Sequence, residues 1–249
     1  MSAAAVRRIR AQAVMELRMM LRNGESVLVT FGIPLVLLVF FSMVDVLPHE
    51  GQRSVEFLVP GVLALAVMSA AMVSLGIATG FERFYLVLKR LGATPLRRRE
   101  LVVAKILSVL AIEAIQIAVI LGIALAGLGY RAPGQAVRGW LALTAVGLGT
   151  AAFAGLGLAM AGRLRAMGTL AVANVAYLAL LLLGGIAFPL DRLPAPVAAL
   201  ARLLPAAPLA DLLRAALGSP TGTVGADLAV LAVWACAATA LASATFRWE

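Results

Sequence analysis

Charged residues are scarce in this chain, and long apolar runs take their place. Only 13% of the 249 residues are charged, about half the share found in an ordinary soluble domain. Hydrophobic residues make up 63% of the sequence, and the mean hydropathy is +1.02. This composition excludes an ordinary soluble domain and predicts that most of the chain lies in a lipid bilayer.

Cysteine and histidine each occur once. Cys236 lies inside an apolar run, so neither a disulfide framework nor a cysteine metal cluster can form within one chain. His49 lies in a short polar loop, where we expect a solvated side chain. The sequence therefore predicts no metal site and no cofactor in this chain.

Motifs for nucleotide hydrolysis and covalent catalysis are also missing. The chain has no G-x-x-x-x-G-K-[ST] phosphate loop, no H-E-x-x-H, no C-x-x-C and no G-x-S-x-G. An intramembrane enzyme, one alternative, would need a base beside its nucleophile at membrane depth, and the only histidine lies outside the apolar runs. We expect a protein that is not an enzyme.

Negative charge is outweighed by positive charge, with a formal net charge of +9. In a soluble protein this balance would suggest nucleic acid as a partner. Here the basic residues gather between apolar runs, as the positive-inside bias of membrane proteins predicts, so we expect no nucleic-acid partner. Arginine far outnumbers lysine, which is typical of a GC-rich bacterial genome and indicates a bacterial inner membrane.

Six apolar runs dominate the chain. They cover about residues 26–46, 57–79, 101–128, 139–161, 167–188 and 225–246. Each run exceeds the roughly 20 residues that a helix needs to cross about 30 Å of hydrocarbon. Only helices and closed barrels satisfy backbone polar groups in lipid, and these runs lack the alternation of strands. The sequence predicts an all-α polytopic membrane protein with six transmembrane helices.

The distribution of Lys and Arg predicts the orientation of these spans. With the N-terminus inside, fifteen basic residues lie in cytoplasmic segments: Arg7, Arg8, Arg10, Arg18, Arg22, Arg83, Lys89, Arg90, Arg97, Arg98, Arg99, Lys105, Arg163, Arg165 and Arg247. Six lie on the outer side: Arg53, Arg131, Arg138, Arg192, Arg202 and Arg214. Because Lys and Arg favour the cytoplasmic side, we expect both termini in the cytoplasm.

Residues 1–24 have the pattern of an amphipathic helix. The apolar face would hold Val6, Ile9, Ala13, Val14, Leu17, Met20 and Leu21, and the polar face Arg7, Arg8, Gln12, Glu16, Arg18 and Arg22. Such a helix favours the membrane interface, where the four arginines of that face would anchor it at the lipid surface; a solvated extension is the alternative. The arginines and the lack of a compact apolar core predict no cleavable signal peptide.

The fourth run carries small residues at a helical repeat. Gly147, Ala151, Gly155 and Ala159 recur every four positions, which lets a neighbouring helix approach closely. We expect these residues to serve packing alone.

Residues 189–220 are rich in proline and contain no stretch long enough to span. The prolines are Pro189, Pro194, Pro196, Pro205, Pro208 and Pro220. Each removes a helix hydrogen bond, so we expect short helices lying on the outer leaflet or re-entering it. Irregular backbone at membrane depth must be buried in protein or face water, which makes this segment a candidate cap or lining of a passage.

Few ionisable or amide side chains interrupt the apolar runs. Glu113, with Gln116 three residues later, lies about a third of the way into the third run, and Asn174 lies in the fifth. Such groups face protein or water rather than lipid. Glu113 either lines a substrate path or makes a structural hydrogen bond between helices, and Lys105 could pair with it only over a long distance.

The most charged segment, residues 82–100, lies between the second and third runs. Its basic residues are Arg83, Lys89, Arg90, Arg97, Arg98 and Arg99, and its acidic residues are Glu82 and Glu100. Residues 82–91 can form about two and a half helical turns, which Gly92 would end before a turn at Thr94 and Pro95. Residues 97–99 would hold the next helix at anionic headgroups. A topogenic charge cluster is the alternative.

Four features in their order along the chain resemble a known family. They are the arginine-rich N-terminal helix, a first span containing Gly32-Ile33-Pro34-Leu35, the loop Leu88-Lys89-Arg90-Leu91-Gly92-Ala93-Thr94-Pro95-Leu96, and the proline-rich stretch 203–214. Together they resemble the six-span permease subunits of the second class of ABC exporters. The loop looks like the antibiotic and multidrug efflux branch more than the polysaccharide branch. The small residue that usually follows the Glu-Arg pair in that family is replaced here by Phe84-Tyr85.

The resemblance implies a division of labour. A separate ATP-binding subunit would bind ATP and Mg²⁺, and two copies of each subunit would assemble, with a homodimer of this chain expected. In that family the loop after the second span forms a coupling helix that docks in a cleft of the ATPase. The corresponding residues here are Glu82, Arg83, Phe84, Tyr85, Leu88, Lys89, Arg90 and Leu91.

Taken together, the sequence predicts a single transmembrane permease domain over residues 1–249. It would belong to an ATP-driven exporter of an amphiphilic, drug-like or lipid-like cargo. Candidate lining residues of its path are Glu113, Gln116, Asn174, Tyr177 and Phe188. An ion- or proton-coupled carrier is the alternative, although such carriers usually place several charged groups near the midplane and show an internal repeat.

Overall fold

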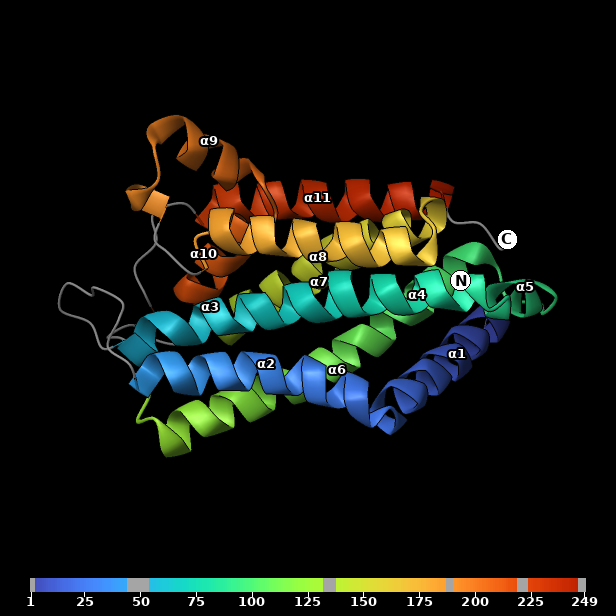
Figure 1. Ribbon diagram of the computed structural model, residues 1–249, viewed down its shortest axis with the longest axis horizontal. Coiled ribbons are helices and arrows are strands. Elements are labelled where there is room, and N and C mark those ends of the chain that lie inside the picture. Colours follow the sequence, from blue (N-terminus) through green and yellow to red (C-terminus); the bar gives the residue numbers. More distant parts are fainter. Residues whose placement is uncertain (1–2, 44–53, 132–137, 187–189, 219–223, 246–249) are drawn as a thin grey trace.

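The apolar runs fold into long helices that lie side by side along the molecule (Figure 1). The computed structural model describes residues 3–43, 54–131, 138–186, 190–218 and 224–245, and within these ranges it contains helices and no strand. The long elements are α2 (Gly24–Met43), α3 (Ser54–Met68), α6 (Arg98–Gly127), α7 (Gly139–Arg163), α8 (Ala166–Leu183) and α11 (Val224–Thr245). The predicted all-α class is confirmed.

Five of the helical segments are long and apolar enough to cross a membrane. They are Val55–Phe84, Arg98–Gly127, Gly139–Arg163, Ala166–Leu183 and Val224–Thr245. They correspond to the second to sixth predicted spans. The first predicted span is α2, whose apolar part within the described residues is the shorter stretch Thr30–Met43. These helices form a multi-pass membrane protein.

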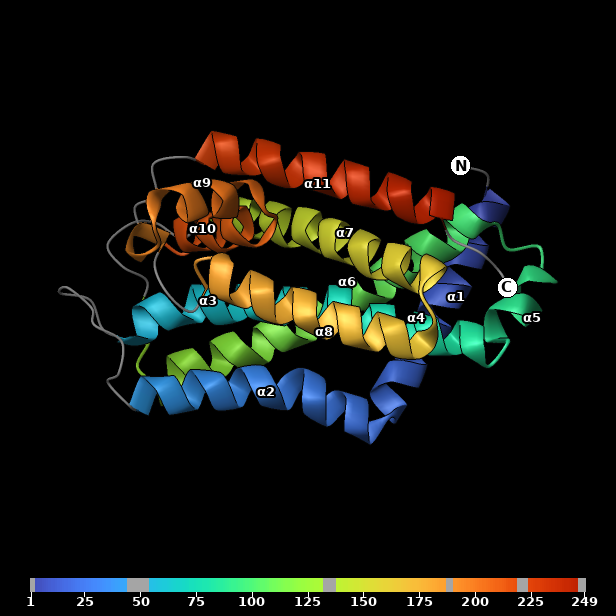
Figure 2. The same ribbon diagram turned by 45° about the horizontal axis from the view of Figure 1, so that its top comes forward.

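The second span is central and is not a regular α-helix throughout. After α3 the chain winds through a π-helical segment, η1 (Ser69–Ser74), and continues as α4 (Leu75–Phe84). Gly157 of α7 packs here so closely that a Cβ atom on it would lie 2.6 Å from the carbonyl oxygen of Met72. Figures 1 and 2 show this span in the middle of the bundle, with α2 and α11 on opposite sides.

The small residues of the fourth run lie on α7, where one of them sets a close helix contact. A Cβ atom on Gly155 would lie 2.5 Å from the carbonyl carbon of Ala238, so α7 and α11 meet backbone to backbone. Gly147 has nothing within 4 Å of such an atom. The repeat therefore brings a neighbouring helix close at Gly155 and not at Gly147.

The proline-rich segment contains three short helices in the described residues: η2 (Leu190–Arg192), α9 (Ala195–Leu203) and α10 (Ala206–Ala216). α9 and α10 meet at 80°. Nearly every residue of α10 is buried, and the helix packs against α3 and α7. Arg214 of α10 is held by Asp211 at 2.8 Å and lies over the Phe57 ring at 4.8 Å.

Two helices from segments predicted to be cytoplasmic lie together at one end of the bundle. These are α1 (Ala3–Arg22), which is inclined to the long helices, and α5 (Val87–Gly92) (Figures 1 and 2). The prediction of a helix at residues 1–24 agrees with α1. The predicted polar face was wrong in part, because Gln12 and Glu16 are buried against the bundle, whereas Val6, Val14 and Leu21 are exposed.

Candidate functional site

The corner between α4 and α5 is the first part of the candidate site. The prediction of one helix over residues 82–91 was wrong, because α4 ends at Phe84 and α5 begins at Val87. Leu86 joins them in the left-handed conformation, at φ 60° and ψ 18°. This conformation is uncommon for a residue with a Cβ atom, and here it turns the chain sharply.

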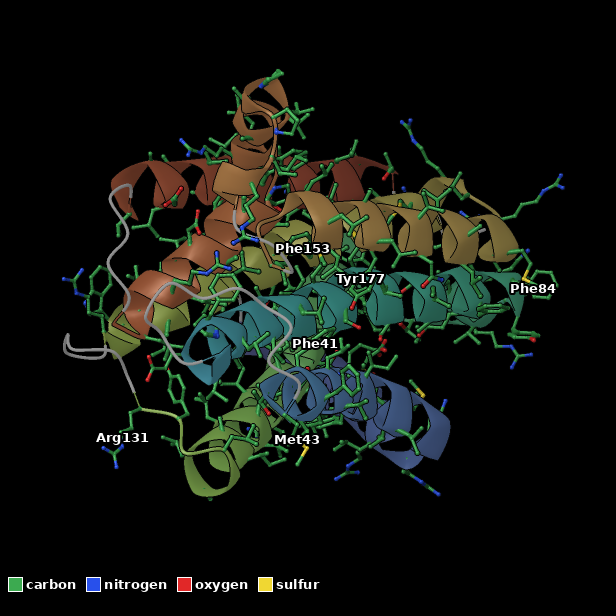
Figure 3. The ribbon with its side chains drawn as sticks, turned by 60° about the vertical axis from the view of Figure 1, so that its left-hand side comes forward. Phe41, Met43, Phe84, Arg131, Phe153 and Tyr177 are labelled. Atoms are coloured by element: carbon green, nitrogen blue, oxygen red, sulfur yellow. The ribbon has the colours of Figure 1, made fainter. Side chains whose placement is uncertain are left out.

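Aromatic side chains cover the outside of this corner. Phe84 and Tyr85 are 67% and 65% exposed, and their rings meet edge to face at 5.2 Å. The Tyr85 ring also stacks on Phe81 at 6.2 Å. Figure 3 shows Phe84 projecting from the end of α4, away from the bundle. Large exposed aromatic side chains are typical of interface cores.

α5 presents charge beside this aromatic surface. Lys89 and Arg90 are exposed, whereas Leu88 is buried and holds the short helix to the bundle. Beyond α5, the Thr94 hydroxyl donates a hydrogen bond to the Leu91 carbonyl at 2.6 Å and fixes the following turn. The exposed corner, with Phe84, Tyr85 and Leu86, and the charged face of α5 are called the corner surface below.

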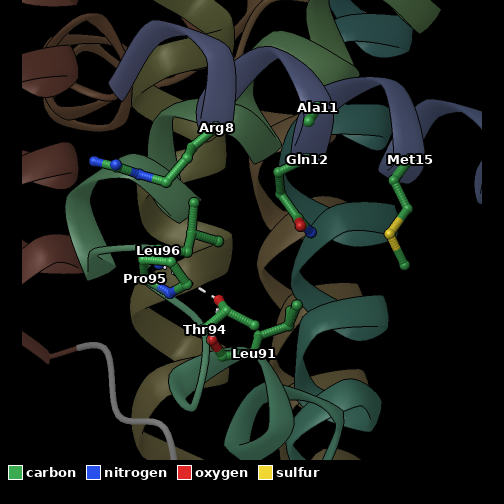
Figure 4. Close-up of a pocket in the computed structure, with 8 residues that line it drawn as sticks. All are labelled: Arg8, Ala11, Gln12, Met15, Leu91, Thr94, Pro95 and Leu96. Carbon is green, nitrogen blue, oxygen red and sulfur yellow. Dashed lines mark hydrogen bonds between the residues drawn. The ribbon is translucent and has the colours of Figure 1, made fainter. Parts of the chain in front are cut away.

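A groove separates the turn after α5 from α1. Its volume is about 270 Å³, and its lining residues are Arg8, Ala11, Gln12, Met15, Leu91, Thr94, Pro95 and Leu96. Figure 4 shows the side chains of α1 on one wall and those of the turn on the other. The groove therefore lies between α1 and the turn that follows the corner surface, at the same end of the molecule.

A buried ion cluster lies behind the corner. The Lys105 ammonium on α6 donates to both carboxylate oxygens of Glu82, at 3.0 and 2.8 Å, and is 3.0 Å from Glu16 Oε1 on α1. Gln12 Nε2 donates to the same Glu16 oxygen at 2.8 Å. The Lys105 side chain is fully buried, and its three donors are used by the two carboxylates. Lys105 pairs with these residues and not with Glu113.

Arg83 points toward a different part of the bundle from Glu82. Its guanidinium donates to the Gly162 carbonyl at 2.7 Å and to the Leu164 carbonyl. Both carbonyl groups belong to the C-terminal end of α7 and the turn into α8, where helix carbonyls lack intrahelical donors and carry partial negative charge. The predicted docking residues Glu82 and Arg83 thus bind inside the protein, while Phe84, Tyr85, Lys89 and Arg90 are on its surface.

The predicted membrane anchors divide into two groups. Arg7, Arg18, Arg22, Arg97, Arg98 and Arg99 are exposed. Arg8 instead forms a two-pronged pair with Glu100, with nitrogen–oxygen distances of 3.0 and 2.6 Å. The hydrogen bond that Arg8 donates to Glu100 raises the pKa of Arg8 above its usual value, so the guanidinium stays charged. Glu100 also accepts the Arg97 backbone N–H at 3.0 Å, which caps the first turn of α6.

Glu113 and Gln116 are buried between helices at membrane depth. Thr150 of α7 donates to a Glu113 carboxyl oxygen and is also 2.7 Å from the Val146 carbonyl. Gln116 donates to the Thr30 carbonyl of α2 at 2.7 Å. Both side chains are 1% exposed, so within this chain they connect α6 to its neighbours.

The other candidate lining residues are not gathered with these two. Asn174 is exposed on α8, where its amide donates to the Leu170 carbonyl one turn earlier at 2.8 Å. Tyr177 is partly buried and points toward the bundle interior (Figure 3). Phe188, like His49, lies outside the described residues. Of the predicted path residues, the four that the structure describes therefore do not line one cavity within a single chain.

The ion cluster was missed by the sequence analysis, although a signal for it exists. Glu82 and Lys105 lie near the cytoplasmic ends predicted for the second and third runs, and Glu16 lies on the helix predicted at the membrane interface. Opposite charges at the same depth on different helices are expected to form ion pairs, because an unpaired charge at the edge of the hydrocarbon is costly. Helical periodicity alone had placed Glu16 opposite the apolar face.

Among the residues that the structure describes, no group of three or more His, Cys, Asp or Glu side chains could hold a metal ion.

Comparison with curated proteins finds no match. The family model described as ABC-2 type transporter matches residues 8–217, which is most of the chain. Members of this family pair with ATP-binding subunits, in which the ATPase activity resides. The chain belongs to the ABC-2 type transporter family and is a membrane permease subunit rather than an enzyme.

Proposed function

We propose that this chain is the permease half of an ATP-driven exporter and that its ATP-binding partner docks on the corner surface. The observation that carries the proposal is the exposed aromatic and basic side chains of Phe84, Tyr85, Lys89 and Arg90 at one end of a membrane bundle. Tyrosine and arginine are enriched among the few residues that dominate the binding energy of protein interfaces. The chain has no phosphate loop, so it depends on another subunit for ATP.

The groove beside α1 extends this docking surface. Its walls are largely apolar, and Arg8 lies at its edge (Figure 4). A partner segment in the groove would contact α1 together with α5 and the turn after it. The interfacial helix and α5 would then respond jointly to movement of the ATPase.

The proposed orientation places this end of the bundle in the cytoplasm. α1 and α5 lie at one end, and α9 and α10 at the other (Figure 1). The basic residues predicted to be cytoplasmic on α1 and α5 are thus separated from Arg202 and Arg214. Positive charge is enriched on the cytoplasmic side of membrane proteins, which supports both termini inside.

The proposed cargo is an amphiphile that moves between two copies of the chain. Large apolar side chains are exposed on α8 and α11, including Val175, Leu178 and Val233. Such faces suit lipid, a second copy or a lipid-like substrate. Drug efflux, as in the antibiotic-resistance branch, would follow from a cargo of this kind. A homodimer with two ATP-binding subunits is the proposed assembly.

A charge reversal on α5 tests the docking proposal. Arg90→Glu should weaken association with the ATP-binding subunit by about tenfold or more, because the interface would meet a charge of the wrong sign. Arg202→Glu makes the same change at the exposed end of α9 and is the matched control. Co-purification from the membrane and the dissociation constant for the isolated ATP-binding subunit measure the effect. Equal binding by wild type and Arg90→Glu would remove α5 from the interface.

A further inference from the structure

Glu82 and Arg83 are neighbours in sequence whose side chains hold different parts of the bundle. Glu82 binds Lys105 of α6, and Lys105 in turn binds Glu16 of α1. Arg83 binds the two carbonyl groups at the α7–α8 turn. Consecutive residues at the end of α4 thus connect this helix to α6 and α1 on one side and to α7 and α8 on the other.

Arg83 also completes a contact face of α4. Gly76, Gly80 and Arg83 are spaced by four and three residues, which places them on one side of the helix. A Cβ atom on Gly76 would lie 3.1 Å from Gly157 Cα of α7, and one on Gly80 would lie 3.3 Å from Thr169 Oγ1 of α8. The backbone of α4 is therefore closely packed along α7 and α8, and Arg83 ends this face with a polar contact.

The geometry of the Arg83 contact requires a guanidinium. The two carbonyl oxygens belong to residues 162 and 164, and separate nitrogens of the planar group donate to them. A lysine ammonium is a compact point charge and does not offer this fixed fork. The contact is strengthened by the negative end of the α7 dipole.

We propose that Arg83 is a positioning residue that makes the cytoplasmic end of each protomer one rigid unit. Movement imposed on α5 would then carry α7 and α8 with it, and Glu82 would carry α6 and α1 through Lys105. Without the Arg83 contact, the same movement would shift the end of α4 relative to α7 and α8 instead of carrying them along. The inference rests on the proposed function, because it takes the ATP-binding subunit to act at α5.

Spin labels on either side of the Arg83 contact test this inference in the whole transporter. Ala93→Cys, just after α5, and Met167→Cys, on α8, are both exposed, and Cys236→Ala removes the only native cysteine. The complex with its ATP-binding subunit is placed in lipid nanodiscs, and the label distance is measured without nucleotide and after trapping with ATP and vanadate. With Arg83 present, we expect the distance within one protomer, isolated by mixing labelled with excess unlabelled protomers, to be narrowly distributed and unchanged by trapping.

Arg83→Gln should keep the ATP-binding subunit bound but lose the rigid connection. The distance distribution should then broaden without nucleotide, and its mean should shift on trapping. Arg163→Gln, at the exposed end of α7, is the matched control and should behave as the parent protein. A narrow, unshifted distribution in Arg83→Gln would overturn the inference. Loss of the ATP-binding subunit from this variant would also overturn it, by making Arg83 a docking residue.

Failure of the proposed function would be seen separately. In that case the parent protein itself would not bind the ATP-binding subunit, while the nucleotide-free distances would still test the Arg83 contact. If Arg83→Gln does not fold, Arg83→Lys keeps the charge but lacks the fork, and a partly broadened distribution is expected. A distribution as narrow as that of the parent protein would then overturn the inference.

Discussion

Lys105 of α6 and Glu16 of α1 form an ion pair of 3.0 Å, although helical periodicity places Glu16 on the polar face of its helix. The pair explains why α1 turns Gln12 and Glu16 toward the bundle and leaves Val6 and Val14 exposed. The N-terminal helix thus leaves part of its apolar side exposed and binds a buried cation with part of its polar side. Its position relative to α6 is fixed by charge as well as by hydrophobic contact.

Removing the Lys105 cation should destabilise the protein strongly. Lys105→Met leaves the Glu16 and Glu82 carboxylates together without their shared partner, and breaking a buried pair in this way costs roughly 3–5 kcal/mol. The triple variant Lys105→Met, Glu16→Gln, Glu82→Gln removes the charges as well, so it should be more stable than Lys105→Met alone. Thermal unfolding of the purified protein in detergent measures the order. Equal stability of the two variants would contradict a coupled buried cluster.

The Glu113 carboxyl group should tolerate conversion to an amide. Thr150 has one hydroxyl hydrogen but lies within reach of both Glu113 and the Val146 carbonyl. In Glu113→Gln the amide N–H can donate to Thr150 Oγ1, and Thr150 can donate to Val146, so stability should be unchanged or higher. Thr150→Val removes the hydroxyl that contacts Glu113 and should lower the free energy of unfolding by about 1–3 kcal/mol.

The Glu113→Gln variant separates the two roles considered for Glu113. If Glu113→Gln folds normally and its transport equals that of the parent protein, the side chain is a structural connection between α6 and α7. Normal folding with lost transport would instead place Glu113 in the substrate path. The measurement is accumulation of a fluorescent amphiphilic dye in inverted vesicles that contain the complete transporter.

The long helices could be predicted from hydrophobic length because lipid imposes that constraint on each span alone. The π-helical segment at 69–74 could not, since it accompanies the close packing of Gly157 against Met72, a contact between residues far apart in sequence. The break at Leu86 was missed for a related reason. Nothing in the local sequence demands a left-handed leucine, and the replacement of the usual small residue by Phe84-Tyr85 gave the only warning.

The candidate site could be located from sequence, but the roles within it could not. Glu82, Arg83, Phe84 and Lys89 occupy one charged segment, and composition treats them as one surface. In the structure the first two face inward and the third faces solvent. Which of these side chains face inward depends on where α5 turns away from α4. That turn depends on packing against the rest of the bundle.

The left-handed conformation of Leu86 gives a prediction about stability. This conformation lowers the free energy of unfolding by about 1–2 kcal/mol when an L-residue other than glycine adopts it. Glycine also raises the conformational entropy of the unfolded chain, which offsets part of this gain. Leu86→Gly should therefore be as stable as the parent protein or slightly more stable. Leu86→Val should be less stable, because a β-branched side chain is less compatible with φ near 60°. Thermal unfolding that ranks valine at or above glycine would show that the corner adopts a different backbone.

The contact between α7 and α11 gives the last prediction, with its control in the same helix. Gly155→Ala would place a Cβ atom 2.5 Å from the Ala238 carbonyl carbon and should force the two helices apart, at a cost of about 1–3 kcal/mol. Gly147→Ala lies on the same helix with nothing within 4 Å of its Cβ atom. It should leave stability unchanged or raise it by up to about 1 kcal/mol, because alanine is the better helix former. Unfolding midpoints in matched detergent compare the two substitutions directly. If both variants unfold at the same temperature, the close approach of α7 and α11 is not required for the fold; a selective loss in Gly155→Ala would identify this glycine as the packing determinant of the sixth span.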